Sequence, residues 1–156
     1  MTLLAVYGTL KNSNIGQSIG VGVLKGGVLV LPEHNMFPAW VDLAPYDDGI
    51  DTVVELFEVT NDTLESLDNY EGVHHDFYIR TMKPVEITEL SEHGVRYMEL
   101  RGGYVSRVVS AYVYKAGRVV RGTDIGSEKF KNPEEYIKYM KSEVWKCLTT
   151  GNWKGS

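Results

Sequence analysis

Cysteine is almost absent from this sequence of 156 residues: Cys147 is the only one, so no disulfide can form within the chain. A single thiol favours a reducing compartment, and we expect a cytoplasmic protein. Long hydrophobic runs are also missing, because no segment approaches the roughly 20 apolar residues of a membrane-spanning helix. The apolar stretch Leu3–Val6 is too short for a signal peptide and has no basic leader. We therefore expect no membrane partner.

Positive charge is scarce as well. Lysine and arginine number 16 against 21 acidic residues, which gives a net charge of −5 at pH 7. A general nucleic-acid binder needs the opposite balance, because basic residues displace the counterions of the phosphates. The segment 128–153 interleaves lysines with aromatic residues, as some single-strand binders do, but glutamates interrupt the pattern. We therefore expect no nucleic-acid partner.

Proline is rare beside glycine, with 5 prolines against 16 glycines, which is typical of a sheet-rich fold with turns and bulges. The length suits one domain, which we take to span residues 1–156. β-Branched and aromatic segments predict strands over Thr2–Tyr7, Asp51–Val59, Phe77–Thr88 and within Val95–Tyr114, and a bent or bulged pair within Val21–Pro32. The residues between Leu10 and Gly20 read as a loop or a short irregular helix, and 89–103 as a hairpin with turns at Ser91–Gly94 and Arg101–Gly103.

Two helices are also predicted. Asp62 and Glu65 resemble a capping box, which opens a short helix through about Tyr70, with Gly72 at its C-terminal cap. Asn132 and Pro133 begin an amphipathic helix over about 133–148. Its apolar stripe is expected to pack on the sheet or on a second subunit, which would make a homodimer, and Cys147 reads as a packed thiol on it. The predicted fold is α+β: a small, mainly antiparallel β-barrel with flanking short helices and this C-terminal helix.

Glu71 is the candidate proton carrier. It follows Leu64 by seven residues and Leu67 by four, so it shares the inward face of the first helix. Burial and the helix C-terminus both disfavour a negative charge, so both should raise its pKa. The residue pattern also allows another interpretation, in which the helix ends before Tyr70 and Glu71 is an exposed turn residue.

The loop Tyr7-Gly8-Thr9-Leu10 is the second candidate feature. A strand that ends in glycine leaves successive backbone N–H groups unpaired, and such groups can hold a carboxylate or a developing oxyanion. Thr9 adds a hydroxyl donor. Taken alone, the segment is more typical of an ordinary turn than of a binding loop.

These segments together resemble the γ-glutamylcyclotransferase-like family. The resemblance rests on Tyr7-Gly8-Thr9-Leu10 after a first strand, on Leu67-Asp68-Asn69-Tyr70-Glu71-Gly72, and on Tyr78-Ile79-Arg80 at the start of a later strand. It extends through residues 26–41 and 54–59 to Ala111-Tyr112-Val113-Tyr114, and so covers about residues 2–115. The sequence departs from the family pattern at Val54, where glycine is usual, and within Lys11–Gly20.

The resemblance implies a specific reaction and a set of residues for it. The family cyclises small γ-glutamyl amines or amino acids to 5-oxoproline, and the glutamate that matches Glu71 is the acid/base. The loop that matches Tyr7, Gly8, Thr9 and Leu10 binds the substrate. Tyr78 is a further candidate for substrate binding, with a core or rim tyrosine as the alternative. The reaction needs no cofactor, because the substrate carries its own nucleophile.

Two alternatives compete with this site. His74-His75-Asp76 could suggest a metal, but neighbouring residues on an extended chain point to opposite faces and no further ligand stands at matching spacing, so no metal is expected. A non-catalytic module that binds a small molecule or peptide on the same fold is the rival function. Arg80 is expected to form a structural salt bridge with Glu71, Asp68 or a surface acid.

Overall fold

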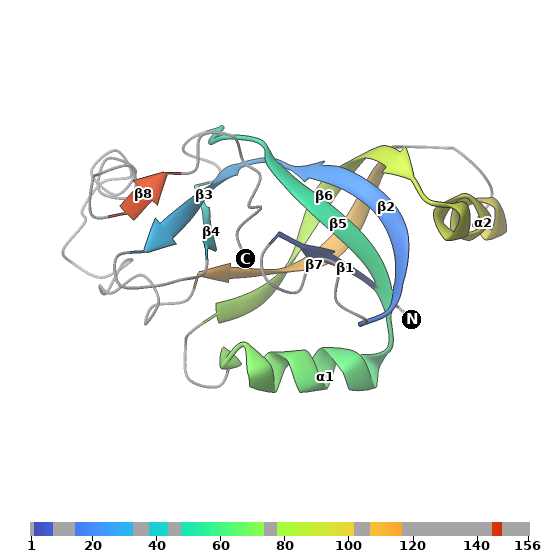
Figure 1. The fold of residues 1–156 in the computed structure, drawn as a ribbon, viewed down its shortest axis with the longest axis horizontal. Coiled ribbons are helices and arrows are strands. Elements are labelled where there is room, and N and C mark those ends of the chain that lie inside the picture. Colours follow the sequence, from blue (N-terminus) through green and yellow to red (C-terminus); the bar gives the residue numbers. More distant parts are fainter. Residues whose placement is uncertain are drawn as a thin grey trace.

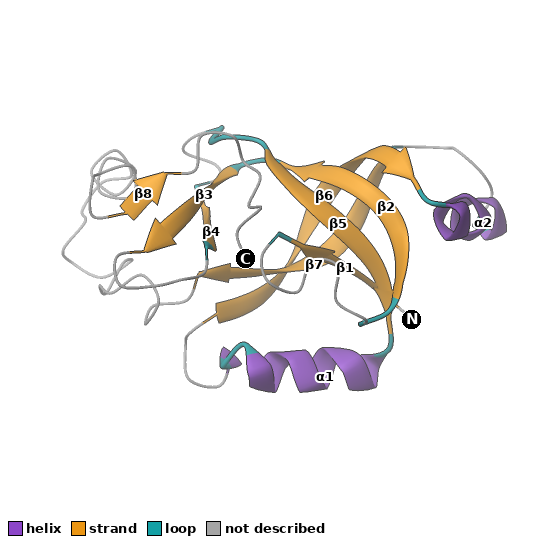
Figure 2. Cartoon of the chain, in the orientation of Figure 1, coloured by secondary structure: helices purple, strands orange, loops and turns teal. Residues whose placement is uncertain are grey.

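The computed structural model describes residues 2–7, 15–32, 38–43, 48–73, 78–101, 107–116 and 145–147. Figure 1 shows the chain and Figure 2 its secondary structure. Within these residues the elements are, in order, β1 (Thr2–Val6), β2 (Gln17–Leu24), β3 (Gly27–Pro32), β4 (Ala39–Asp42), β5 (Thr52–Val59), α1 (Asn61–Tyr70), β6 (Tyr78–Leu90), α2 (Glu92–Leu100), β7 (Val108–Ala116) and β8 (Trp145–Cys147).

The strands form one sheet that closes into a five-stranded barrel. The order along the sheet is β1-β5-β2-β6-β7-β4-β3-β8, and a further pairing of β1 with β7 closes the ring β1-β5-β2-β6-β7. Pairing is antiparallel except where β7 meets β1 and β4, which lie parallel to it. The barrel curls around in Figure 1, with β4, β3 and β8 extending the sheet to one side. The predicted α+β barrel is confirmed.

Alternating side chains separate the barrel interior from its outer face. On β1, Leu3 and Ala5 belong to the interior cluster, whereas Leu4 and Val6 belong to a second cluster on the outer face. The outer cluster also contains Leu64 and Leu67, which are the buried side chains of α1. Helix α1 therefore packs across the outside of the barrel, where Figure 1 shows it beneath β1 and β7.

Helix α1 begins and ends with well-defined caps. Thr60 is the N-cap, and its hydroxyl oxygen accepts a hydrogen bond from the Thr63 amide at 3.1 Å. The cap is thus Thr60 rather than the predicted pair Asp62 and Glu65, because Asp62 already lies in the first turn. At the other end Gly72 has φ of +67°, the left-handed conformation that glycine adopts readily after a helix. That part of the prediction is confirmed.

Helix α2 replaces the predicted hairpin over 89–103. Ser91 is its N-cap, with its hydroxyl oxygen accepting from the Gly94 amide at 2.9 Å, and the predicted turn Ser91–Gly94 is therefore the helix start. Gly94 was misread as a turn glycine; its role is to let the helix approach β2 closely. A Cβ at Gly94 would collide with the carbonyl oxygen of Ile19.

Replacing Gly94 by alanine is expected to destabilise the protein by several kcal/mol, because the new methyl group meets backbone rather than a flexible side chain. Urea denaturation of the variant and of the wild type measures the loss. A variant as stable as the wild type would contradict the close contact of Gly94 in α2 with the backbone of β2.

Three other predictions are corrected or limited by the structure. Residues 17–20, predicted as part of a loop, belong to β2. The predicted strand pair within Val21–Pro32 exists as β2 and β3 with an irregular register in β2, but β2 pairs with β5 and β6 rather than with β3. The predicted helix over 133–148 lies outside the described residues except for Trp145–Cys147, which form β8 against β3. No helix in the described part of the chain has the length and apolarity needed to span a bilayer.

Candidate functional site

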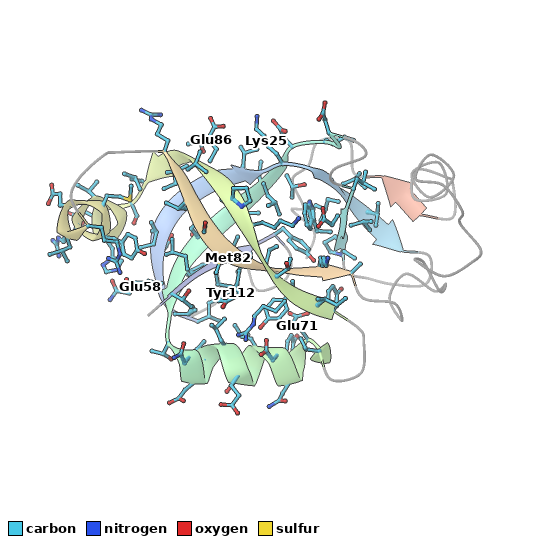
Figure 3. All side chains as sticks on the ribbon, turned by 180° about the vertical axis from the view of Figure 1, so that it is seen from behind. Lys25, Glu58, Glu71, Met82, Glu86 and Tyr112 are labelled. Atoms are coloured by element: carbon cyan, nitrogen blue, oxygen red, sulfur yellow. The ribbon has the colours of Figure 1, made fainter. Side chains whose placement is uncertain are left out.

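Glu71 directly follows the last residue of α1 and lies on the side of the helix that packs on the barrel. Its backbone is still helical, with φ of −78° and ψ of −4°, and its amide donates to the carbonyl oxygen of Leu67 at 2.7 Å. The preceding residue, Tyr70, is 70% exposed, whereas Glu71 is half-buried. Figure 3 shows Glu71 at the end of α1, on the side toward the sheet. The interpretation of Glu71 as an exposed turn residue is therefore wrong.

Burial changes the acidity of Glu71. It raises the pKa of the carboxyl from 4.5 to about 7, because the charged form loses solvating water. Among the described residues, none forms a hydrogen bond or salt bridge with the carboxylate that would offset this loss. A carboxyl in this state takes up and releases a proton near neutral pH.

The negative charge of Glu71 contributes to the raised pKa values of three tyrosines. The pKa of Tyr78 is raised to about 12, first by burial and then by the negative charge of Glu71. The pKa of Tyr7 is raised by burial, by Tyr78 and by Glu71, against a lowering effect of its hydrogen bond with the Trp40 amide. Tyr114 also has a raised pKa, mainly from burial and from Asp68, with a smaller contribution from Glu71. The fold thus brings Tyr7, Glu71 and Tyr78 into one neighbourhood.

Tyr7 lies at a fork in the sheet. Along one edge of β7, Tyr112 pairs with Leu4 of β1, and Lys115 pairs with Trp40 of β4. The Tyr7 hydroxyl fills the gap between these pairings: it donates to the Tyr114 carbonyl oxygen at 2.5 Å and accepts from the Trp40 amide at 3.1 Å.

This arrangement gives the Tyr7 hydroxyl a structural role. Because its hydroxyl is engaged by two backbone groups, it anchors the end of β1 from which the predicted substrate loop leaves. Gly8, Thr9 and Leu10 lie outside the described residues, as do His74 and His75, so the predicted row of amides stays a prediction. The hydroxyl of Tyr78, in contrast, forms no hydrogen bond with any residue that the structure describes, and its role in binding substrate stays a prediction.

A polar network that was only partly predicted lies beside Glu71. The Tyr114 hydroxyl donates to Asp68 Oδ1 at 2.7 Å, and Arg80 Nη2 lies 3.4 Å from Asp68 Oδ2. The Arg80 guanidinium also lies 4.8 Å from the centre of the Tyr112 ring. The Asp68–Arg80 salt bridge was one of the pairings expected. Tyr114 was named only within the matched segment Ala111-Tyr112-Val113-Tyr114, and no role was predicted for it; the spacing of Tyr112 and Tyr114 places both on one face of the strand.

A cleft of about 450 Å³ opens on the outer face of the barrel beside this network. Its lining comes from α1, β1, β6 and β7 and consists of Thr2, Asn61, Leu64, Glu65, Asp68, Arg80 and Tyr112. Figure 3 shows Tyr112 on the sheet above α1. Glu71 does not line this cleft, whereas the salt-bridged pair Asp68 and Arg80 does.

The comparison with protein families decides the classification. The sequence model of the family described as "Gamma-glutamyl cyclotransferase, AIG2-like" matches residues 4–132. The chain belongs to this family. The match extends past the part in which the resemblance was recognised from motifs, and it confirms that resemblance. Membership supports a cyclotransferase-type enzyme that acts on a small γ-glutamyl molecule.

Solved structures share the fold at low sequence identity. An AIG2-like protein from Mus musculus is 23% identical with a TM-score of 0.56, over 74% of this chain and 77% of that one. An uncharacterised protein from Pyrococcus horikoshii is 16% identical with a TM-score of 0.51, over 97% and 89% of the two chains. A protein named gamma-glutamyl cyclotransferase is 14% identical with a TM-score of 0.50, over 99% and 92%. The comparison with curated proteins gives no significant match.

Proposed function

We propose that this protein is a γ-glutamyl cyclotransferase that releases 5-oxoproline and a free amine from a small γ-glutamyl amine or amino acid, with Glu71 as the general acid/base. The observation that carries this proposal is the carboxyl at the end of α1, which is half-buried, unpaired among the described residues, and has a pKa of about 7. Family membership supports the reaction type.

The reaction needs one group that shuttles protons. Glu71 removes a proton from the α-ammonium of the substrate, and the freed amine attacks the γ-carbonyl carbon. A new C–N bond closes the five-membered lactam while the original amide C–N bond breaks. Glu71 returns its proton to the departing nitrogen, and the second proton lost by the attacking nitrogen ends there too, so the amine leaves as an ammonium. A pKa near 7 suits both halves of this exchange.

The remaining groups bind and orient the substrate. We propose that the amides of Gly8–Leu10 hold the substrate and stabilise charge on the carbonyl oxygen, with Tyr7 anchoring their strand. We propose that the hydroxyl of Tyr78, whose pKa responds to the charge of Glu71, binds the substrate near Glu71. Because nucleophile and electrophile belong to one molecule, holding a productive conformation contributes an effective molarity on the order of 10⁵ M. The lone cysteine of the chain is consistent with a cytoplasmic setting.

An assay with a panel of substrates tests this function. Purified full-length protein is offered γ-glutamyl amino acids, γ-glutamyl-ε-lysine and glutathione, and 5-oxoproline is measured by mass spectrometry. We expect at least one of these compounds to yield 5-oxoproline and one equivalent of amine. If none yields product while one binds in calorimetry, the protein is the non-catalytic binding module, and the enzymatic proposal is lost.

A further inference from the structure

We propose that Tyr114 is a positioning residue that sets the placement of Glu71 relative to the end of β1, because this one residue is bonded to both sides of the site. The inference rests on the proposed function. Its two contacts come from different groups of the same residue, the backbone carbonyl and the side-chain hydroxyl.

The carbonyl of Tyr114 holds the β1 side. The Tyr7 hydroxyl donates to it at 2.5 Å, at the point where the edge of β7 changes partner from β1 to β4. Tyr7 is buried, and its other contact is the amide of Trp40, whose side chain is fully buried. Tyr7, the last residue before the predicted loop Gly8–Leu10, is therefore held to β7 at Tyr114.

The hydroxyl of Tyr114 holds the α1 side. It donates to Asp68 Oδ1 at 2.7 Å and lies 3.5 Å from the carbonyl oxygen of Leu64. Asp68 stands three residues before Glu71, which is less than one helical turn. Arg80 of β6 holds the other carboxylate oxygen of Asp68 at 3.4 Å. The last turn of α1 is thus fixed to two neighbouring strands through a single carboxylate.

Loss of the Tyr114 hydroxyl should change the position and the solvent exposure of the Glu71 carboxyl. Tyr114 is buried and its hydroxyl donates to a carboxylate, which is a hydrogen bond of the stronger kind. Without it, the contacts among the described residues that still hold the last turn of α1 are the Arg80 salt bridge and packing, and water gains access to the carboxyl that burial now keeps at a high pKa. The described groups whose pKa values respond to the charge of Glu71 are Tyr7, which follows β1, Tyr78 at the start of β6 and Tyr114 in β7.

Tyr114 is not itself a catalytic residue in this proposal, because both of its polar groups are engaged within the protein. Replacing it by phenylalanine removes only the hydroxyl and keeps the carbonyl contact with Tyr7. Tyr112→Phe is the matched control. It removes a hydroxyl two residues away on the same face of β7, and that hydroxyl bonds to no described residue, while the ring beside Arg80 remains.

The experiment compares wild type, Tyr114→Phe and Tyr112→Phe in the full chain, at a temperature where circular dichroism shows all three folded. For Tyr114→Phe we expect kcat to fall about tenfold or more with KM changed by less than about threefold, because the base is misplaced rather than the substrate lost. The acidic limb of its pH–rate profile should move to lower pH by at least about half a unit. Tyr112→Phe should match the wild type.

A double-mutant cycle with Asp68→Asn adds a second readout. If both residues act through one contact, Asp68→Asn should cost much less kcat in the Tyr114→Phe background than in the wild type. Full additivity overturns the proposal, as does a Tyr114→Phe variant that loses only thermal stability and keeps the kcat and the pH limb of the wild type.

The test separates this inference from the proposed function. If the wild type makes no 5-oxoproline from the panel, the proposed function fails. The positioning of Glu71 is then tested by a measurement that needs no enzymatic activity. Titration of the ¹³C-labelled Glu71 carboxyl by NMR should still show a lower midpoint in Tyr114→Phe than in Tyr112→Phe. Equal midpoints overturn the inference whether or not the protein is an enzyme.

Discussion

Replacing Glu71 by glutamine is expected to lower kcat/KM for 5-oxoproline release by about 10²- to 10⁴-fold, because the amide keeps the size of the side chain but cannot carry the proton. The matched control is Glu65→Gln, which neutralises an exposed carboxylate of α1 that lines the outer cleft, whereas Glu71 does not line it, and this control should leave the rate unchanged. A Glu71→Gln variant within a fewfold of the wild type would contradict the assignment of Glu71 as the acid/base.

The same substitution should stabilise the protein at alkaline pH, which separates lost chemistry from lost folding. Burial raises the folded-state pKa of Glu71 to about 7, above its ordinary value of 4.5. Its contribution to stability is therefore fully present below about pH 4.5 and is lost as the pH rises through 7. Glutamine has no charge to bury, so at pH 8 the variant should exceed the wild type by roughly 1 kcal/mol or more, allowing for solvent screening.

Urea denaturation at pH 8 measures this difference in the free energy of unfolding. The wild type and Glu65→Gln should agree, with Glu71→Gln above both. A Glu71→Gln variant less stable than the wild type at pH 8 would mean that the charged carboxyl is better solvated, or better paired, than the structure indicates.

The pH dependence of the wild type should be the second large effect. With Glu71 as the base, kcat/KM is expected to rise about tenfold per pH unit below 7 and to level off above it, so that the rate at pH 5 is about 100-fold below the plateau. Initial rates at constant ionic strength give the profile. The residual rate of Glu71→Gln should lack this limb. An acidic limb with its midpoint near 4.5 in the wild type would show that the base is an ordinary exposed carboxyl.

The part of the site that depends on local spacing could be predicted from the sequence. The face of α1 was correctly assigned, because Leu64, Leu67 and Glu71 recur at helical intervals and both leucines are buried. The strand Thr2–Tyr7 and the glycine cap at Gly72 follow from equally local signals. The Asp68–Arg80 salt bridge could be predicted only as one of several pairings, because the sequence allows Arg80 to pair with Asp68, with Glu71 or with a surface acid.

The remaining features depend on contacts between distant segments. Gly94 is typical of a turn in sequence, and only its approach to the Ile19 carbonyl explains a glycine inside a helix. Tyr7 was predicted to bind substrate, but its hydroxyl is engaged by backbone groups of Trp40 and Tyr114, which lie 33 and 107 residues away. Tyr114 belongs to a segment that matches the family, but the segment gives it no role. Its position at the fork of the sheet becomes visible only once β1, β4 and β7 are placed together.

The central claim is that the carboxyl at the end of α1 faces inward and exchanges a proton near neutrality. The measurement that tests it most directly is an NMR titration of the ¹³C-labelled glutamate carboxyls of the folded wild type, with the Glu71 signal assigned by its absence from Glu71→Gln. The structure predicts a midpoint near 7 for this signal. A midpoint near 4.5, where exposed glutamates titrate, would contradict the account.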